Sequence, residues 1–391
     1  MNMNMNMKLS NISITQLILE FEKIYYHFWF FSKYLIDSNL YGDYKYLFNG
    51  RWLVGKFIYE FDYKCINFLV KRYKHFNYKF NFKTDHIDLV PIIDNFDYLK
   101  LINRQKYLID QFFHFIYDYT TNNKYNIKSL ILHFIVKINF FIENIVALFY
   151  YNNINLPINN IILNYKIPKY TLTIKWIPVI GGLFNNYYIK SFHMTENPIS
   201  VGQYIQFILK DGYKNKKYWS ELGWNWKTKY NIDKPDRWDI NFDHLIINGK
   251  NISYYLNHPV NHISYWEAEA YCNWIGGKLP TCLQWEWVAS NRNKSTYPLG
   301  INKPNKYLYN VNLTMKDTIA NTNTNINKSI IGFNDLYGNV WEWCDSSFSK
   351  KTKIIKGGSW VTCDYILSNQ LERNINQNCR YFPIGFRVIK N

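Results

Sequence analysis

The residues that could do chemistry are most concentrated in the stretch 332–343, which reads G-F-N-D-L-Y-G-N-V-W-E-W. It carries two carboxylates, Asp335 and Glu342, on either side of a turn glycine, Gly338. Two further blocks follow it: G-G-S-W (357–360) and G-F-R (385–387). Glycines allow close backbone approach, and indoles fill the space between irregular loops. We predict a loop-rich core held by aromatic side chains, and a bound ion is one interpretation of the carboxylates.

The thiols do not form a recognisable motif. The six cysteines show no C-x-x-C pair and no regular spacing.

The N-terminus, M-N-M-N-M-N-M-K-L-S, is polar and lacks the apolar core of a secretory signal. The apolar run 129–151 is interrupted by charged and polar residues, so no membrane span is predicted. We expect a cytoplasmic protein with reduced thiols.

The net charge of +17 would suit an anionic partner such as a nucleic acid. The lysines, however, are scattered and mostly solitary, without a basic run or a recognition motif. Nucleic acid is therefore the least favoured partner. It would require lysines clustered on one surface and binding that falls steeply with salt.

The first part of the chain has helical periodicity. After a leader, 1–10, apolar residues recur at spacings of three and four within 12–40. These are Leu17, Phe21, Ile24, Tyr25 and Phe28. Three more helices are predicted at 52–73, 94–119 and 129–151. Four helices in 11–151 indicate an up-and-down bundle.

The pattern changes after a polar linker, 152–169. Short alternating runs predict strands at 170–177 and 187–193, with a tight turn at Gly181-Gly182. Three helix starts then carry a capping box, in which the N-cap and a residue three positions later satisfy each other's backbone amides. The pairs are Ser200 with Gln203, Ser264 with Glu267, and Thr281 with Gln284. Gly276-Gly277 is expected to end the second of these helices.

Six blocks in this second part carry a resemblance to a known family. They are N-P-I-S-V-G-Q-Y (197–204), H-P-V-N-H-I-S-Y-W-E-A-E-A-Y-C-N-W (258–274), K-L-P-T-C-L-Q-W-E-W (278–287), L-Y-G-N-V-W-E-W (336–343), K-G-G-S-W (356–360) and G-F-R (385–387). In this order they resemble the formylglycine-generating-enzyme-like, or sulfatase-modifying-factor, domain. The resemblance implies an α+β, loop-rich, C-type-lectin-like fold for 170–391.

Within that superfamily the chain looks most like the iron-dependent sulfoxide synthases of ergothioneine and ovothiol biosynthesis. The segment 211–226, the Pro235 and Trp238 that follow it, and the preceding helical, DinB-like bundle carry this resemblance. It implies an oxidoreductase that uses Fe(II) and O₂ to join a thiol to a histidine derivative. The histidine derivative would lie between the two domains.

The iron site implied by this resemblance needs three imidazoles, which leave coordination positions open for substrate and O₂. The aligned positions hold other residues: Arg51 and Val54, or Leu53 and Lys56 in the alternative alignment, and Lys137 and Phe141. These positions predict a degenerate iron site. The alternative is a relocated site made by three histidines of the predicted helices: His27, His114 and His133.

Other family sites can be compared in the same way. Relatives hold a structural Ca²⁺ at positions that correspond to Asp335, Gly338, Val340 and Glu342, whereas the alternative is that Glu342 pins backbone amides without an ion. The copper site of formylglycine-generating enzymes needs two cysteines after the G-G-S-W block. Only Cys363 is present, so it is read as a core residue. Structural roles are expected for His258, His262, Arg373, Arg387 and the motif tryptophans.

Three functions remain open from the sequence. The first is an active iron enzyme with relocated ligands. The second, favoured by the aligned residues, is a pseudoenzyme or ligand-binding module with a lectin-like fold. The third is a basic protein that binds nucleic acid.

Overall fold

The computed structural model describes four residues of the N-terminal region, Phe21, Ile24, Tyr25 and Phe28, and most of the chain from position 124 onward. The described ranges are 124–151, 173–240, 245–247, 250–251, 254–300, 304–315, 317–321, 327–380 and 383–391. The chain divides into two compact units, Met1–Ile154 and Asn155–Asn391. The predicted helices at 52–73 and 94–119 and the linker lie outside the described residues, so the four-helix bundle stays a prediction.

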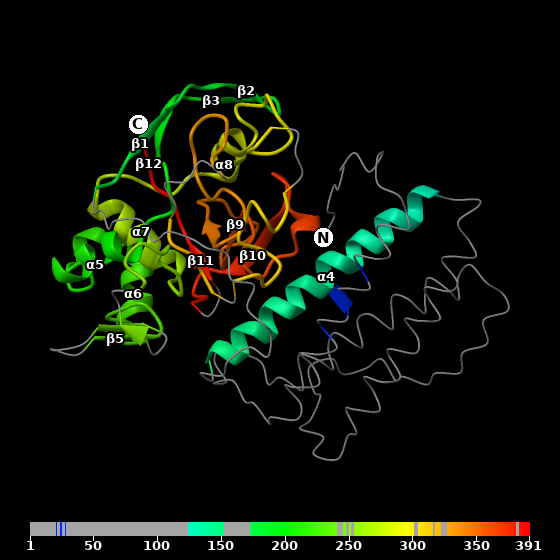
Figure 1. Ribbon diagram of the computed structural model, residues 1–391. Coiled ribbons are helices and arrows are strands. Elements are labelled where there is room, and N and C mark those ends of the chain that lie inside the picture. Colours follow the sequence, from blue (N-terminus) through cyan, green and yellow to red (C-terminus); the bar gives the residue numbers. More distant parts are fainter. Residues whose placement is uncertain are drawn as a thin grey trace, which may run out of the picture. The chain divides into compact units, whose positions relative to one another are not determined.

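Helix α4 (Lys124–Tyr151) is the longest helix among the described residues of the first unit (Figure 1). It begins five residues before the predicted start at position 129. Phe21, Ile24, Tyr25 and Phe28 are helical and buried, which confirms the apolar face predicted for that stretch. The ring of Phe21 meets Phe134 of α4 edge to face, with centroids 6.3 Å apart. Within the described residues, no helix combines the length and apolar character needed to cross a membrane.

The second unit combines small sheets with short helices. One sheet has the strand order β10-β9-β8-β11, in which β11 runs parallel to β8 and the other pairs are antiparallel. Its strands are β8 (Trp341–Trp343), β9 (Thr352–Lys356), β10 (Glu372–Asn376) and β11 (Ile384–Gly385). An antiparallel sheet joins β1 (Trp176–Val179), β4 (Phe192–Thr195) and β12 (Ile389–Lys390). The two C-terminal strands therefore belong to different sheets: β11 is an edge strand of the first and β12 an edge strand of the second.

Two smaller antiparallel pieces complete the strands: β2 (Gly182–Phe184) with β3 (Tyr187–Ile189), and β5 (Trp238–Ile240), β6 (Leu245–Ile247) and β7 (Lys250–Asn251). The predicted turn at Gly181-Gly182 is wrong. The hairpin turns at Asn185-Asn186, whose φ angles of 49° and 66° suit asparagine. The strand predicted at 187–193 is two strands, and the one predicted at 170–177 begins only at Trp176.

The helices are α5 (Val201–Leu209), α6 (Glu221–Lys229), α7 (Tyr265–Trp274) and α8 (Cys282–Ala289). Short 3₁₀ turns lie at Lys216–Tyr218 and Asp364–Ile366. All three predicted capping boxes are confirmed at α5, α7 and α8. Helix α7 ends before Gly276, whose φ of 74° terminates it as predicted. Figure 1 shows α5, α6 and α7 gathered on one side of this unit and the β2–β3 hairpin near α8.

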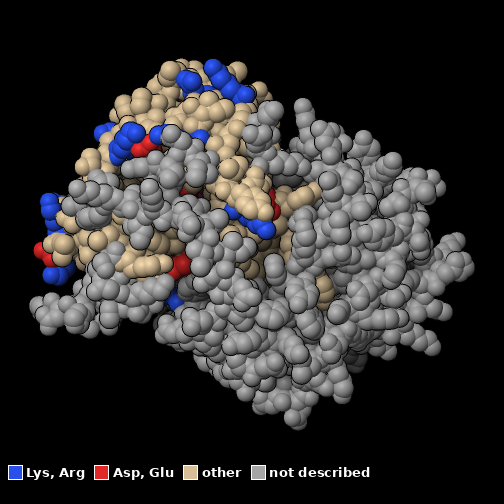
Figure 2. Space-filling model, in the orientation of Figure 1, with Lys and Arg blue, Asp and Glu red and all other residues tan. Residues whose placement is uncertain are grey.

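Aromatic side chains fill the core of the second unit, as the sequence predicts. Trp285, Trp341 and Trp343 are completely buried. Gly338 allows the chain to turn between them, because its φ is 72° and a Cβ atom there would lie 2.5 Å from the Asn310 carbonyl oxygen. The lysines and arginines seen in Figure 2 form small, separated groups on the visible face.

Candidate functional site

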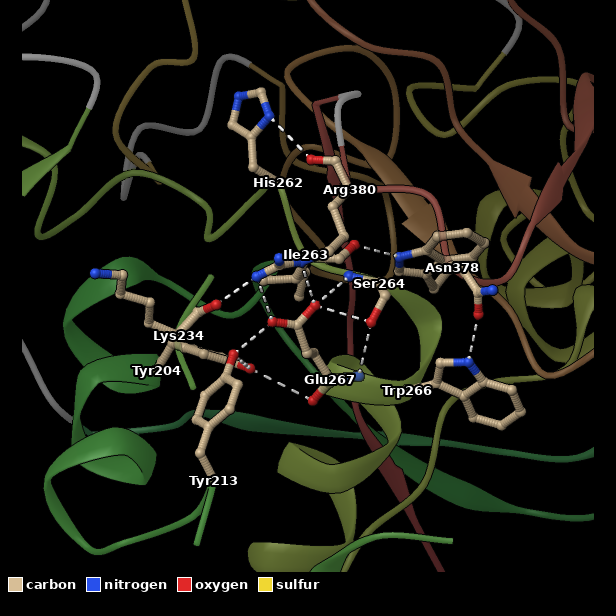
Figure 3. Close-up of polar contacts among 11 residues, drawn as sticks. Tyr204, Tyr213, Lys234, His262, Ile263, Ser264, Trp266, Glu267, Asn378 and Arg380 are labelled. Carbon is tan, nitrogen blue, oxygen red and sulfur yellow. Dashed lines mark hydrogen bonds and ion pairs between the residues drawn. The ribbon is translucent and has the colours of Figure 1, made fainter. Parts of the chain in front are cut away.

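The first charged cluster of the second unit surrounds Glu267, at the start of α7 (Figure 3). This side chain is fully buried, and its Oε2 atom accepts hydrogen bonds from the backbone N–H and the hydroxyl of Ser264, both at 2.8 Å. The Nε and Nη2 atoms of Arg380 donate to the two carboxylate oxygens at 2.9 and 3.0 Å. We call Glu267, Arg380, Ser264, Tyr213 and Tyr204 the Glu267 centre.

Two phenols complete this centre. The Tyr213 hydroxyl donates to Glu267 Oε1 at 2.7 Å and lies 3.0 Å from the Tyr204 hydroxyl. Burial, together with the Glu267 charge, raises the pKa of both phenols well above the usual value. Burial opposes the charge on Arg380, but Glu267 outweighs it and the pKa of Arg380 is raised. The phenols are therefore neutral donors and the guanidinium is a permanent cation.

The Glu267 centre also fixes the loop that follows β10. Arg380 donates to the Lys234 carbonyl, and the Arg380 carbonyl lies 3.3 Å from Nδ1 of His262. The Trp266 indole donates to Asn378 Oδ1 at 2.8 Å. Burial and the nearby arginines lower the pKa of His262 well below the usual value, so this imidazole is neutral. The structural role predicted for His262 agrees with these contacts.

A second cluster, the Glu342 centre, consists of Glu342, Arg387, Trp285 and Asp335. Nε of Arg387 lies 2.9 and 3.1 Å from the two Glu342 oxygens, and the Trp285 indole donates to Oε2 at 2.8 Å. The Arg387 fork also donates to backbone carbonyls: Glu196 at 2.6 Å, Thr195 at 3.4 Å, and Asn334. Arg387 therefore ties loops together through carbonyl groups, as the sequence predicts, and also neutralises a buried carboxylate.

Asp335 is the uncompensated member of the Glu342 centre. Its Oδ1 accepts from the Asn327 amide, whereas Oδ2 is buried without a hydrogen-bond partner among the described residues. Burial raises the pKa of this carboxyl to about 7, although the Arg387 charge acts in the opposite direction. A neutral carboxylic acid is stable here near neutral pH because no donor compensates a charge on Oδ2.

These contacts test the predicted calcium site. Gly338 and Val340 lie in the same buried turn as Asp335 and Glu342. Calcium needs six to eight oxygen ligands that are free to coordinate. Both oxygens of Glu342 accept from Arg387 or Trp285, whereas Asp335 Oδ2 has no hydrogen-bond partner among the described residues, so the calcium site stays a prediction. The alternative interpretation, that Glu342 pins backbone amides, needs correction because its partners are side chains.

The structure describes the backbone of only one of the three histidines in the predicted relocated iron site. His27 and His114 lie outside the described residues, and His133 lies in α4 without a described side chain. Lys137 and Phe141 lie on the same helix, and Phe141 is buried. Among the described residues, no three His, Cys, Asp or Glu side chains come together as a metal site would require.

The contacts of two further residues, Cys363 and His258, bear on the structural roles predicted for them. Cys363 is buried at the start of the 3₁₀ turn, as its interpretation as a core residue predicts. Nδ1 of His258 pairs with the Thr318 hydroxyl at 2.9 Å. The residue that sequence reasoning missed is Arg380, which belongs to none of the six motif blocks. The sequence clue to this arginine was the capping residue Glu267, because a carboxylate is completely buried only when a cation lies beside it.

Residues 184–391, more than half of the chain, match the family described as the sulfatase-modifying factor enzyme 1-like domain. The chain belongs to this family, and its second unit is an α+β domain of that kind. The predicted family resemblance is thereby confirmed. The hercynine oxygenase of Mycobacterium tuberculosis is 27% identical over 203 residues, which cover 46% of this chain and 48% of the relative.

A second kind of relative carries a different name. The inactive C-alpha-formylglycine-generating enzyme 2 of Bos taurus is 34% identical over 127 residues, which cover 29% of this chain and 42% of the relative. Among solved structures, CarF aligns with 56% of this chain and 99% of its own at 17% identity and a TM-score of 0.42. The chain spans about half the length of the curated relatives it matches.

Proposed function

We propose that this protein is a hercynine-oxygenase-like member of the family that binds a histidine derivative without iron-dependent O₂ chemistry. The observation that carries this proposal is the identity of the residues at the expected iron positions. Arg51, Val54, Lys137 and Phe141 stand there, and the alternative alignment substitutes Leu53 and Lys56 for the first two. Neither a guanidinium, an ammonium nor a hydrocarbon replaces a neutral imidazole as a ligand for Fe(II).

The relatives support both parts of this proposal. The hercynine oxygenases carry a name that indicates a betaine of histidine as substrate. The inactive C-alpha-formylglycine-generating enzyme 2 carries the name of a member without activity. A histidine derivative is therefore the ligand class to test first, and loss of catalysis has a precedent in the family.

The two charged centres support a scaffold that stays intact without a metal. The glutamate of each centre has a guanidinium partner from the same unit: Glu267 has Arg380, and Glu342 has Arg387. Internal pairing of this kind neutralises buried charge without an ion. The fold can therefore retain a binding surface after the iron ligands have changed.

Calorimetric titration of the full chain tests the proposal. The titrant is histidine betaine, and unmethylated histidine is the matched control. We expect saturable binding of the betaine and weaker binding of histidine. O₂ uptake with Fe(II), cysteine and the betaine should equal that of the protein-free mixture. Absence of betaine binding would refute the ligand assignment, and protein-dependent O₂ uptake would refute the loss of catalysis.

The rival function is an active enzyme with relocated ligands, and the name of the hercynine oxygenases is the observation that favours it. In that case His27, His114 and His133 would hold the iron. Replacement of His133 by Ala would then abolish protein-dependent O₂ uptake. Our proposal predicts no protein-dependent O₂ uptake with either the unmodified chain or the variant.

A further inference from the structure

Two cysteines that are far apart in the sequence meet beside α8. Cys282 is the first residue of this helix, and Cys344 directly follows β8. The segments that carry them are joined on both sides. The Cys282 N–H donates to the Ser346 hydroxyl at 3.0 Å, and the Asp345 N–H donates to the Pro280 carbonyl at 2.8 Å. These bonds hold the two cysteine-bearing segments against each other, and each thiol perturbs the pKa of the other. We call them the thiol pair.

The two thiols of the pair differ in access. Cys344 is completely buried, whereas Cys282 is 8% exposed, so an oxidant in solution reaches Cys282 first. The Sγ atom of Cys344 lies 3.9 Å from the Glu342 carbonyl oxygen. The more accessible thiol is therefore paired with a completely buried one.

The surroundings also distinguish the two thiols electrostatically. The hydrogen bond from Cys344, and then the charge of Lys356, lower the pKa of Cys282 despite its burial and the opposing charge of Glu372. Burial raises the pKa of Cys344 well above the usual value. Lys356 is itself held by Glu286 at 2.7 Å and by Glu372 at 3.6 Å. The N-terminus of α8 adds a further preference for a thiolate at Cys282.

We propose that the thiol pair is an oxidation site, in which Cys282 reacts with a peroxide and Cys344 resolves the product to a disulfide. In the first step the Cys282 thiolate attacks a peroxide oxygen. A sulfur–oxygen bond forms, the oxygen–oxygen bond breaks, and hydroxide leaves and is protonated to water. In the second step Cys344 attacks the Cys282 sulfur. A sulfur–sulfur bond forms, and the sulfenic oxygen leaves with the thiol proton as water.

The single buried thiols provide the comparison. Cys272 is completely buried, and burial raises its pKa well above the usual value. It should therefore remain reduced under conditions in which the thiol pair reacts. A disulfide between Cys282 and Cys344 would connect the start of α8 to the end of β8 covalently, next to the Glu342 centre.

Peptide mapping of the full chain tests this proposal. The reduced protein is treated with hydrogen peroxide, alkylated and digested with trypsin. We expect a cross-link between peptides 279–292 and 329–350, each of which contains one cysteine. Without peroxide, Cys282 should be alkylated at pH 7 at least about tenfold faster than Cys272, because its thiolate fraction is larger.

Two variants keep the proposal falsifiable. In Cys344→Ser the resolving thiol is absent, so dimedone should label a sulfenic acid at Cys282. Cys272→Ser is the matched control, and its cross-link should form as in the unmodified chain. Oxidation of Cys282 no faster than that of Cys272, or a Cys282 disulfide to any residue other than Cys344, would overturn the proposal.

Discussion

In the Glu267 centre the carboxylate accepts hydrogen bonds from its own helix terminus, from a phenol and from Arg380. In the Glu342 centre the carboxylate has Arg387 and one indole, and a second carboxyl, Asp335, lies in the same cluster. Arg380 is 16% exposed, whereas Arg387 is completely buried. The first centre has several donors that share one charge, and the second depends on a single cation.

This difference predicts different consequences when each arginine is removed. A buried charge with several other donors loses part of its stabilisation, whereas a buried charge with one cation loses most of it. The predictions that follow use this contrast, and each pairs a residue of one centre with a control.

The largest expected effect is that of Arg387→Leu. It removes the cation paired with the buried Glu342 carboxylate and one donor to each of three backbone carbonyls, so the free energy of unfolding should fall by about 3–5 kcal/mol. Arg380→Leu should cost less, about 2–3 kcal/mol, because Ser264 and Tyr213 still donate to Glu267. Urea denaturation followed by near-ultraviolet circular dichroism measures both. Equal losses would contradict the contrast between the two centres.

The pH dependence of Asp335→Asn should be next in size. The pKa of Asp335 is about 7 in the folded state, above the usual value, so the folded chain binds this proton more tightly than the unfolded chain. The resulting stability is fully present below the unfolded pKa and is lost as the pH rises through about 7. At pH 8 the variant should be more stable than the unmodified chain by on the order of 3 kcal/mol.

Asp345 provides a control for that experiment, because its pKa is shifted in the opposite direction. Lys353 and Tyr265 hold the pKa of Asp345 below the usual value despite its burial. Its contribution to stability is therefore present above the unfolded pKa and is lost as the pH falls through the folded one. Asp345→Asn should lose stability at neutral pH and approach the unmodified chain in acid. A difference of the same sign for both variants would contradict the assigned pKa directions.

Tyr213→Phe tests how the donors share the Glu267 charge. It removes the hydrogen bond to the Glu267 carboxylate together with the contact to Tyr204, and should cost about 1.5–3 kcal/mol. Tyr204→Phe removes only contacts to neutral groups, the Tyr213 hydroxyl and the Glu267 carbonyl, and should cost about 0.5–1.5 kcal/mol. The same urea titrations measure both. A larger loss for Tyr204 would show that the phenols do not act through Glu267.

The smallest effect is expected at the helix cap. Ser264→Ala removes the hydroxyl that donates to Glu267 and also caps the helix, and should cost about 1–2 kcal/mol. Ser200→Ala removes a cap of the same kind at α5, where Gln203 is neutral, and should cost about 0.5–1 kcal/mol. If the two losses are equal, the charge of Glu267 adds nothing to the cap.

The local parts of this fold could be predicted from the sequence. A capping box needs only residues three positions apart, so the starts of α5, α7 and α8 were predicted correctly. The motif blocks likewise identify the family because their order is visible in the chain. The hairpin turn was placed at two glycines because glycine is the strongest local signal, although Asn185 and Asn186 also tolerate positive φ.

The long-range contacts could not be predicted in this way. Arg380 meets Glu267 across 113 positions, and Cys282 meets a residue near the end of β8. No periodicity or spacing connects such residues, because the folded sheets and loops bring them together. The partners of Glu342, at the predicted calcium position, could not be predicted for the same reason. The sequence shows the oxygen atoms of Glu342, but only the structure shows that Arg387 already uses them.

Anaerobic Fe(II) binding to the full chain, measured by metal analysis after desalting, tests the central claim most directly. The account predicts no retained iron, because the expected ligand positions hold residues such as Arg51 and Lys137 instead of histidines. About one iron per chain, lost on replacement of His133 or His114 by Ala, would contradict it and would show that the iron site has moved.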